Sequence, residues 1–155
     1  MSHRLVTALS EVRTAVDARL PELLLSGPGE ADPLDPLPAA TREALLSPGK
    51  RVRPGLVFLT GELFGVAPAR LLDPACAVEM LHAASLALDD LPSMDDAPTR
   101  RGRPSVHAAF GEDLAILAAV ALLARSFGVL AESGLRAPRH GGVGQAAALD
   151  LVSRL

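Results

Sequence analysis

The chain has 155 residues, the length of one domain, and 49% of them are hydrophobic, which is enough for a sizeable buried core. Only 3% are aromatic, so Leu, Ala and Val must do most of the packing, and Leu and Ala favour helices. The net charge of -3 argues against a nucleic-acid-binding protein, because contacts to a phosphate backbone normally require an excess of basic residues.

Cysteine content and hydropathy bear on the compartment. Cys76 is the single cysteine, so an intramolecular disulfide is impossible, and its apolar neighbours predict a buried thiol. The first sixteen residues mix acidic and basic side chains, unlike a secretory signal. The longest apolar run, residues 114–124, is shorter than the roughly 20 residues of a membrane span. We therefore expect a soluble, cytoplasmic protein with no transmembrane segment.

The first third of the chain predicts helices interrupted by one long loop. Apolar residues recur every three or four positions between residues 5 and 25, which indicates an amphipathic helix. The Pro- and Gly-rich residues 26–38 predict a loop inside a single domain that spans residues 1–155. A short helix is expected from Pro38 to just before Pro48, and a third helix is expected to begin at Pro54.

The remaining segments are also predicted to be helical. Asp73 and Pro74 are typical of a cap and a first helical turn, so a helix should cover residues 74–90. A loop over residues 91–104, a short turn of helix near Val106 and a long apolar helix over residues 112–132 follow, and another helix should begin in the tail and stop at Leu155. No segment alternates with period two, so we predict an all-α fold without strands.

Four carboxylates lie close together in DDLPSMDD, residues 89–96: Asp89, Asp90, Asp95 and Asp96. They follow the end of an apolar helix, whose partial negative charge increases their mutual repulsion. Mg²⁺ would relieve this repulsion, since it binds a few carboxylates together with water and substrate phosphate oxygens. A solvated acidic turn is the usual alternative for an isolated pair, but the doubled pair favours metal binding.

Two basic runs indicate two anion sites. They are GKRVRP, residues 49–54, and RRGRP, residues 100–104. Arginine matches phosphate oxygens bidentately, and the second run lies close enough to Asp96 to neutralise the same ligand. His82 lies seven residues before Asp89, on nearly the same helix face, although a lone histidine is more often a core residue than a ligand.

Together these motifs resemble a known family. The segment AVEMLHAASLALDDLPSMDD (residues 77–96), followed by RRGRP and HAAFGEDLAILAA, is similar to the first aspartate-rich motif of trans-isoprenyl diphosphate synthases. GKRVRP resembles their isopentenyl diphosphate site, and the match extends over residues 49–131. The resemblance implies the N-terminal half of a farnesyl or geranylgeranyl diphosphate synthase of the polyprenyl synthetase family. It also implies a truncated antiparallel helical bundle of the isoprenoid synthase type, usually homodimeric.

The resemblance assigns roles to individual residues. Asp89 and Asp95 resemble the Mg²⁺ ligands and Arg100 the contact to the allylic diphosphate, and these three form the catalytic set. The residues that resemble the isopentenyl diphosphate site are Lys50, Arg53, His82 and Arg101. The family is composed of prenyltransferases of isoprenoid biosynthesis, which condense an allylic diphosphate with isopentenyl diphosphate.

Product length in the family depends on side-chain size before the aspartates. Ala84 and Ser85 are small, so they leave room for a chain longer than farnesyl, and geranylgeranyl diphosphate is the expected product. Leu81 is a residue that could still limit the chain.

Two departures from the family pattern leave the function open. After Leu135 the only acidic residue is Asp150, so the second aspartate-rich motif is missing, and Ala119-Val120 stands where many relatives have Gly-Asp. We favour the N-terminal half of an ordinary synthase, and the runner-up is a non-catalytic or regulatory partner subunit of a full-length synthase. A half-protein that completes its catalytic site with another chain is a third hypothesis. A class I terpene cyclase would also use an aspartate cluster, but it would not need GKRVRP.

Overall fold

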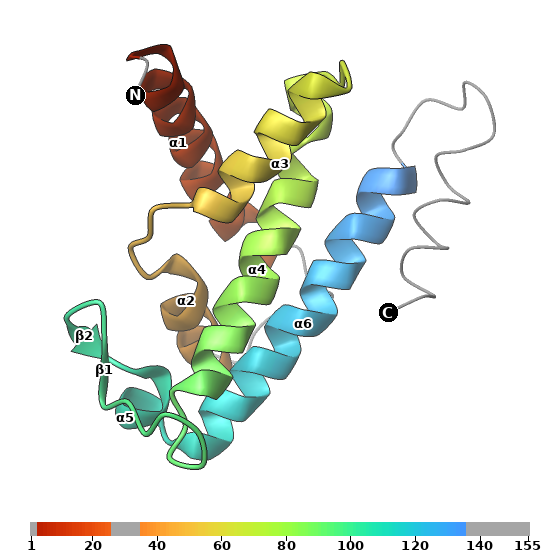
Figure 1. The fold of residues 1–155 in the computed structure, drawn as a ribbon. Coiled ribbons are helices and arrows are strands. Elements are labelled where there is room, and N and C mark those ends of the chain that lie inside the picture. Colours follow the sequence, from red (N-terminus) through yellow and green to blue (C-terminus); the bar gives the residue numbers. More distant parts are fainter. Residues whose placement is uncertain (1–2, 26–34, 136–155) are drawn as a thin grey trace.

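The fold is all-α, as predicted, in a computed structural model that describes residues 3–25 and 35–135. The helices are α1 (His3–Leu25), α2 (Leu37–Leu46), α3 (Val52–Leu63), the 3₁₀ helix η1 (Pro68–Arg70), α4 (Leu72–Asp89), α5 (Val106–Phe110) and α6 (Glu112–Leu135) (Figure 1). The helix expected in the tail and most of the loop expected over residues 26–38 lie outside the described residues.

The antiparallel pair α4 and α6 forms the centre of the molecule (Figure 1). Small side chains face the core from both helices: Ala83, Ala84 and Ala87 on α4, and Ala115, Ala118 and Ala119 on α6. On α6 this stripe continues through Leu122 and Val129, which is the spacing of one helix face. Because alanine has a short side chain, the two helix backbones can approach closely.

The helices α1, α2 and α3 pack against α4 and enlarge the core. Val16 and Leu20 of α1 and Leu45 of α2 are fully buried or nearly so. Cys76 of α4 is completely buried, and this burial raises the pKa of its thiol to about 12. The thiol therefore stays protonated and unreactive at neutral pH, in agreement with the prediction.

Two helix starts differ from the sequence-based expectations. The helix α3 begins at Val52 instead of Pro54, because proline is tolerated throughout the first helical turn. The helix α4 begins at Leu72 with Leu71 as its N-cap residue instead of Asp73. The Asp73 carboxylate accepts hydrogen bonds from Arg19 Nε at 2.8 Å and Nη2 at 3.2 Å, so it joins α4 to α1.

The prediction of no strands is wrong at RRGRP. Two short strands, β1 (Thr99–Arg100) and β2 (Arg103–Pro104), pair antiparallel, with Thr99 opposite Pro104 and Arg100 opposite Arg103. The connecting residues Arg101 and Gly102 both have positive φ values, 53° and 78°, which is the conformation of a tight hairpin turn. Strands of two residues are too short to show an alternating pattern.

We expected no segment long and apolar enough to span a membrane, but one helix meets this criterion by its length and composition. Within the described residues, Glu112–Gly134 is long and apolar enough to do so, although only a third of its most apolar window is buried. The uninterrupted apolar run ends before Arg125, but the helix continues beyond it. The alanine stripe of α6 packs against the core, and core helices of soluble proteins can be equally long and apolar.

Candidate functional site

A concave pocket of about 480 Å³ lies where the connection between α2 and α3, the middle of α4 and the tip of the β-hairpin meet. We call it the basic pocket. Its lining residues are Arg13, Pro48, Gly49, Lys50, Arg51, Val52, Arg53, Glu79, His82 and Arg101. All four residues expected to bind isopentenyl diphosphate therefore line one pocket, although they come from three separate segments of the chain.

Arg101 reaches the basic pocket because the hairpin folds back over residues 48–50. Its Nη1 donates a hydrogen bond to the carbonyl oxygen of Pro48. A Cβ atom on residue 49 would lie 2.6 Å from this nitrogen, so the close approach of the guanidinium requires Gly49. The glycine of GKRVRP thus makes room for an arginine of RRGRP, and this contact joins the two basic runs.

His82 is neutral at physiological pH in this environment. Its pKa lies below the usual value of 6.5, mainly because partial burial disfavours the charged imidazolium, and then because of the positive charge of Arg53. Arg101 and Arg100 lower the pKa further, whereas Glu79 opposes the shift. A neutral imidazole can still donate one hydrogen bond to an anion.

We use the name acidic loop for residues 89–96, at the C-terminal end of α4. Its shape depends on backbone hydrogen bonds: the Asp95 amide donates to the Asp89 carbonyl at 2.9 Å, and the Asp96 amide donates to the Leu91 carbonyl at 3.0 Å. Asp96 adopts a left-handed conformation with φ of 46° to close the turn. The backbones of Asp89 and Asp95 are thereby brought next to each other.

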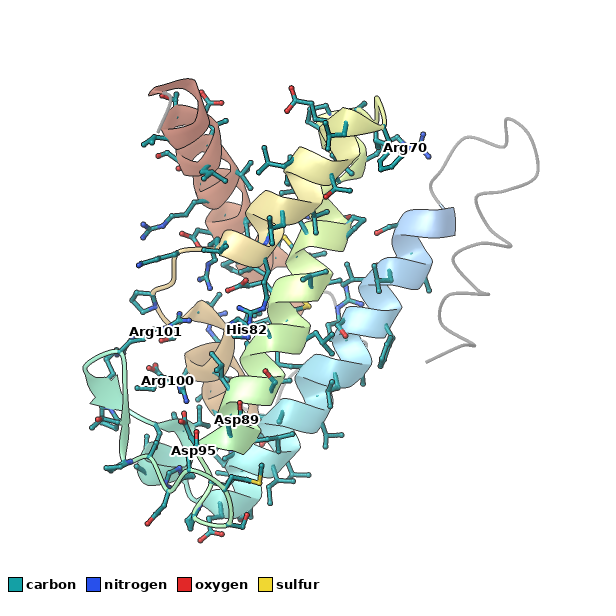
Figure 2. All side chains as sticks on the ribbon, viewed as in Figure 1. Arg70, His82, Asp89, Asp95, Arg100 and Arg101 are labelled. Atoms are coloured by element: carbon teal, nitrogen blue, oxygen red, sulfur yellow. The ribbon has the colours of Figure 1, made fainter. Side chains whose placement is uncertain are left out.

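In Figure 2, His82, Asp89, Asp95, Arg100 and Arg101 lie on one side of the molecule. Arg101 and His82 face each other across the basic pocket, Arg100 lies below them, and Asp89 and Asp95 follow at the lower end of α4. Arg70 lies at the opposite end of the molecule. Five of the predicted substrate and metal residues therefore lie on the same side of the molecule.

Asp90 differs from its neighbours in the acidic loop, because its side chain is only 2% exposed. It binds Arg100 through three short hydrogen bonds, from Nε to Oδ1 (2.9 Å) and Oδ2 (2.7 Å) and from Nη2 to Oδ1 (2.6 Å). These hydrogen bonds are the main reason why the pKa of Arg100 is raised. Asp90 thus fixes the orientation of a partly exposed guanidinium.

The four carboxylates expected to bind metal do not converge. Within residues 3–25 and 35–135, no three His, Cys, Asp or Glu side chains lie close enough to hold a metal ion. Asp90 points to Arg100, whereas Asp95 and Asp96 are exposed. The adjacent pair Asp89 and Asp95 still suits Mg²⁺, because this ion commonly takes one or two carboxylates and completes its shell with water and substrate phosphate.

A smaller cavity of about 40 Å³ is lined by residues of both charged regions. It shares Arg51, Glu79, His82 and Arg101 with the basic pocket, and it is also lined by Asp90 and Arg100. An anion in the basic pocket would therefore lie close to the arginine that Asp90 holds.

The sequence interpretation missed a group of buried charges beneath the basic pocket. Arg51 belongs to a basic run in the sequence, but it is buried and pairs with Asp17 and Glu79. Burial alone would lower the pKa of Arg51, but the hydrogen bonds to Asp17 and Glu79 outweigh it, so the pKa is raised. One signal was present in the sequence: Glu79 interrupts an otherwise apolar helix face, and such a carboxylate usually has a buried partner.

Comparison with known proteins gives a consistent picture. The polyprenyl synthetase profile matches residues 35–154. The geranylgeranyl diphosphate synthase of Pantoea ananas is 53% identical over 128 residues, which are 81% of this chain and 41% of that protein. Geranylgeranyl pyrophosphate synthase 12, chloroplastic, of Arabidopsis thaliana is 52% identical over 112 residues, or 70% of this chain and 31% of the relative.

Solved structures agree with the predicted fold. An FPP/GFPP synthase from Zymomonas mobilis superposes with a TM-score of 0.84 at 36% identity, covering 99% of this chain and 52% of that one. A geranyltransferase from Legionella pneumophila gives 0.75 at 37% identity, covering 82% and 44%. The bundle is therefore of the isoprenoid synthase type. The chain spans about two fifths of the length of the Pantoea relative and about half of the length of the Zymomonas structure.

Proposed function

Because the chain belongs to the polyprenyl synthetase family, we propose that it carries the diphosphate-binding part of a Mg²⁺-dependent prenyltransferase site. The reaction would condense an allylic diphosphate with isopentenyl diphosphate. The observation that carries this proposal is the basic pocket beside the acidic loop, with a smaller cavity lined by residues of both regions. Cations and carboxylates in this arrangement suit one diphosphate held directly and another held through metal.

The basic pocket would bind the diphosphate of isopentenyl diphosphate. Three exposed cations surround it: Lys50, Arg53 and Arg101. Because these side chains are exposed, their charged groups can contact phosphate oxygens directly. The neutral His82 would add a hydrogen bond from α4. This pocket holds the isoprenoid diphosphate so that its double bond can face the allylic carbon.

Asp89 and Asp95 would hold Mg²⁺ at the allylic diphosphate, where the bound ion stabilises the negative charge that grows on the departing group. Arg100 would contact the same diphosphate directly. We assign Asp90 to the orientation of Arg100, since its carboxylate is already used there. Asp96 shapes the turn through its left-handed backbone, and its carboxylate is exposed beside the pair.

The α4 face that leads to Asp89 supports a long product chain, although Ala84 is not part of that face. Ala84 is fully buried in the core, which corrects its expected place in the cavity wall. Ser85 and Leu81 lie four and eight residues before Asp89, and both are exposed. The small Ser85 would let the chain pass, so geranylgeranyl diphosphate is the proposed product, in line with the names of the relatives.

A regulatory partner subunit is the second candidate function. Such a partner would complete or modify the site of another synthase chain. For both candidates we also propose assembly as a homodimer or hetero-oligomer and a cytoplasmic location.

Isothermal titration with isopentenyl diphosphate in the absence of Mg²⁺ tests the first candidate. Lys50→Ala should weaken binding by about tenfold or more, because it removes a charge-assisted contact, and the loss should exceed that for dimethylallyl diphosphate with Mg²⁺. Arg70→Ala is the matched control, since Arg70 is exposed and distant from the pocket. Equal losses for both substrates would contradict two separate anion sites. No binding by the unmodified chain would contradict the proposal as a whole.

The two candidates are separated by turnover. Product formation from both substrates by the chain alone supports a synthase. If the chain alone forms no product but changes the rate or product of a full-length synthase when the two are mixed, the result supports a partner subunit.

A further inference from the structure

Arg51 lines the basic pocket, but its side chain is buried in the pocket wall. Lys50 and Arg53 are exposed, whereas the Arg51 side chain is only 4% exposed. Its guanidinium donates to Asp17 Oδ1 at 2.7 Å, to Glu79 Oε1 at 2.8 Å and to the Ser47 carbonyl at 3.3 Å. One side chain therefore ties the pocket wall to α1, α4 and the end of α2.

The backbone of Arg51 adopts a conformation that a residue with a Cβ atom rarely takes. Its φ and ψ angles of 50° and 40° are left-handed, and it is the N-cap residue of α3. Such a conformation is strained and persists only when the surroundings hold it. The three hydrogen bonds of the guanidinium provide that hold. This turn places Lys50 and Arg53 at the pocket, while the Arg51 side chain is buried in its wall.

Arg51 also compensates a carboxylate that would harm anion binding. Glu79 lines the basic pocket, and its side chain is only 5% exposed. Without Arg51 its negative charge would repel a diphosphate and attract Lys50 or Arg53, with little screening by water. The pairing removes this repulsion and keeps both neighbouring cations available.

We infer that Arg51 is a positioning residue of the basic pocket: it does not touch the diphosphate, but it fixes the turn that presents Lys50 and Arg53 and cancels the charge of Glu79. This inference rests on the proposed diphosphate-binding function of the pocket. It separates GKRVRP into two residues that bind the ligand and one that supports them.

Calorimetric titration with inorganic pyrophosphate, without metal, tests the inference on the full chain. Arg51→Gln leaves Glu79 uncompensated, so affinity should fall by about tenfold. Adding Glu79→Gln to Arg51→Gln should recover roughly threefold or more, although the ion pair is then absent altogether. Neutralising the unpaired carboxylate of Glu79 also restores stability, so the titrations are run well below the melting temperature of every variant. Under these conditions all variants are folded, and the recovery reports on the charge in the pocket.

Arg51→Lys covers the case in which Arg51→Gln does not fold. Lysine keeps the charge but lacks the planar guanidinium fork that spans Asp17, Glu79 and the Ser47 carbonyl. The affinity of Arg51→Lys should therefore lie between those of the unmodified chain and Arg51→Gln. Unchanged affinity in Arg51→Lys and in any folded Arg51→Gln variant, while Lys50→Ala still weakens binding, would overturn the inference alone. Absence of pyrophosphate binding by the unmodified chain would overturn it together with the proposed function.

Discussion

The basic pocket and the acidic loop share one structural feature, but they differ in how many charged side chains they bring together. In each, one charged residue turns inward and pairs with an opposite charge: Arg51 with Glu79, and Asp90 with Arg100. The neighbouring charges then face outward. The basic pocket gathers several cations around one cavity, whereas the acidic loop brings only Asp89 and Asp95 together.

This difference predicts different metal requirements. Cations that already converge can bind a diphosphate without help, so binding in the basic pocket should not need Mg²⁺. Two carboxylates repel a diphosphate unless a cation lies between them, so the acidic loop should bind diphosphate only with Mg²⁺. The predictions below test this contrast.

The largest expected effect is the loss of the Mg²⁺-dependent part of pyrophosphate binding in Asp89→Ala. Titration with and without Mg²⁺ should show a metal-dependent gain in affinity for the unmodified chain and none for the variant. Far-ultraviolet circular dichroism should be unchanged, because Asp89 is the last residue of α4 and lies outside the core. Glu62→Ala, which removes an exposed carboxylate from α3, is the control and should keep the full gain. A normal gain in Asp89→Ala would refute the metal assignment.

The next largest effect separates the supporting aspartate from the exposed one. Asp90→Asn should lower the free energy of unfolding by about 1–3 kcal/mol, because it weakens a buried, charge-assisted pairing with Arg100. Asp95→Asn should change it by less than about 0.5 kcal/mol, since the side chain is exposed. Urea denaturation measures both. Equal changes would mean that the two aspartates do not differ in the way described.

A smaller effect is expected from the contact that joins the two basic runs. Gly49→Ala would place a methyl group 2.6 Å from Arg101 Nη1 and 3.1 Å from Arg51 Nη1. The exposed Arg101 side chain can move away, and the ion-paired Arg51 needs to shift by only a few tenths of an ångström. Stability should therefore be retained, while pyrophosphate affinity falls by roughly threefold through the displaced arginine. Gly128→Ala on α6 adds the same methyl group near Arg125 Nη1, at an ordinary contact distance of 3.4 Å, and should leave affinity unchanged. Full affinity in Gly49→Ala would show that Arg101 does not need its observed position.

Sequence reasoning predicted the helices well, because apolar spacing of three and four is repeated over many residues in α1, α4 and α6. It also named the exposed charges of both regions, since motifs record which residue types occur together. It could not show that Arg51 and Asp90 turn inward. Their orientation depends on partners 28 and 10 residues away, Glu79 and Arg100, and on a left-handed backbone at Arg51 that residue type does not predict.

The smallest expected effect concerns the protonation of His82. Its pKa is lowered in the folded chain, so the unfolded chain binds more protons as the pH falls below about 6.5. The contribution of His82 to stability is therefore present above that pH and is lost as the pH falls through the folded pKa. Melting temperatures measured from about pH 7.5 to 5.5 should decline slightly less in His82→Asn than in the unmodified chain.

The same histidine reports on the contrast between the two regions. By NMR titration, Arg53→Ala should raise the pKa of His82, because a neighbouring positive charge is removed. Pyrophosphate should raise it as well, since negative charge in the basic pocket favours the imidazolium. Mg²⁺ alone should leave it unchanged, because the ion would bind at Asp89 and Asp95 and not in the basic pocket. A shift of His82 with Mg²⁺ but not with pyrophosphate would reverse the roles assigned to the two regions.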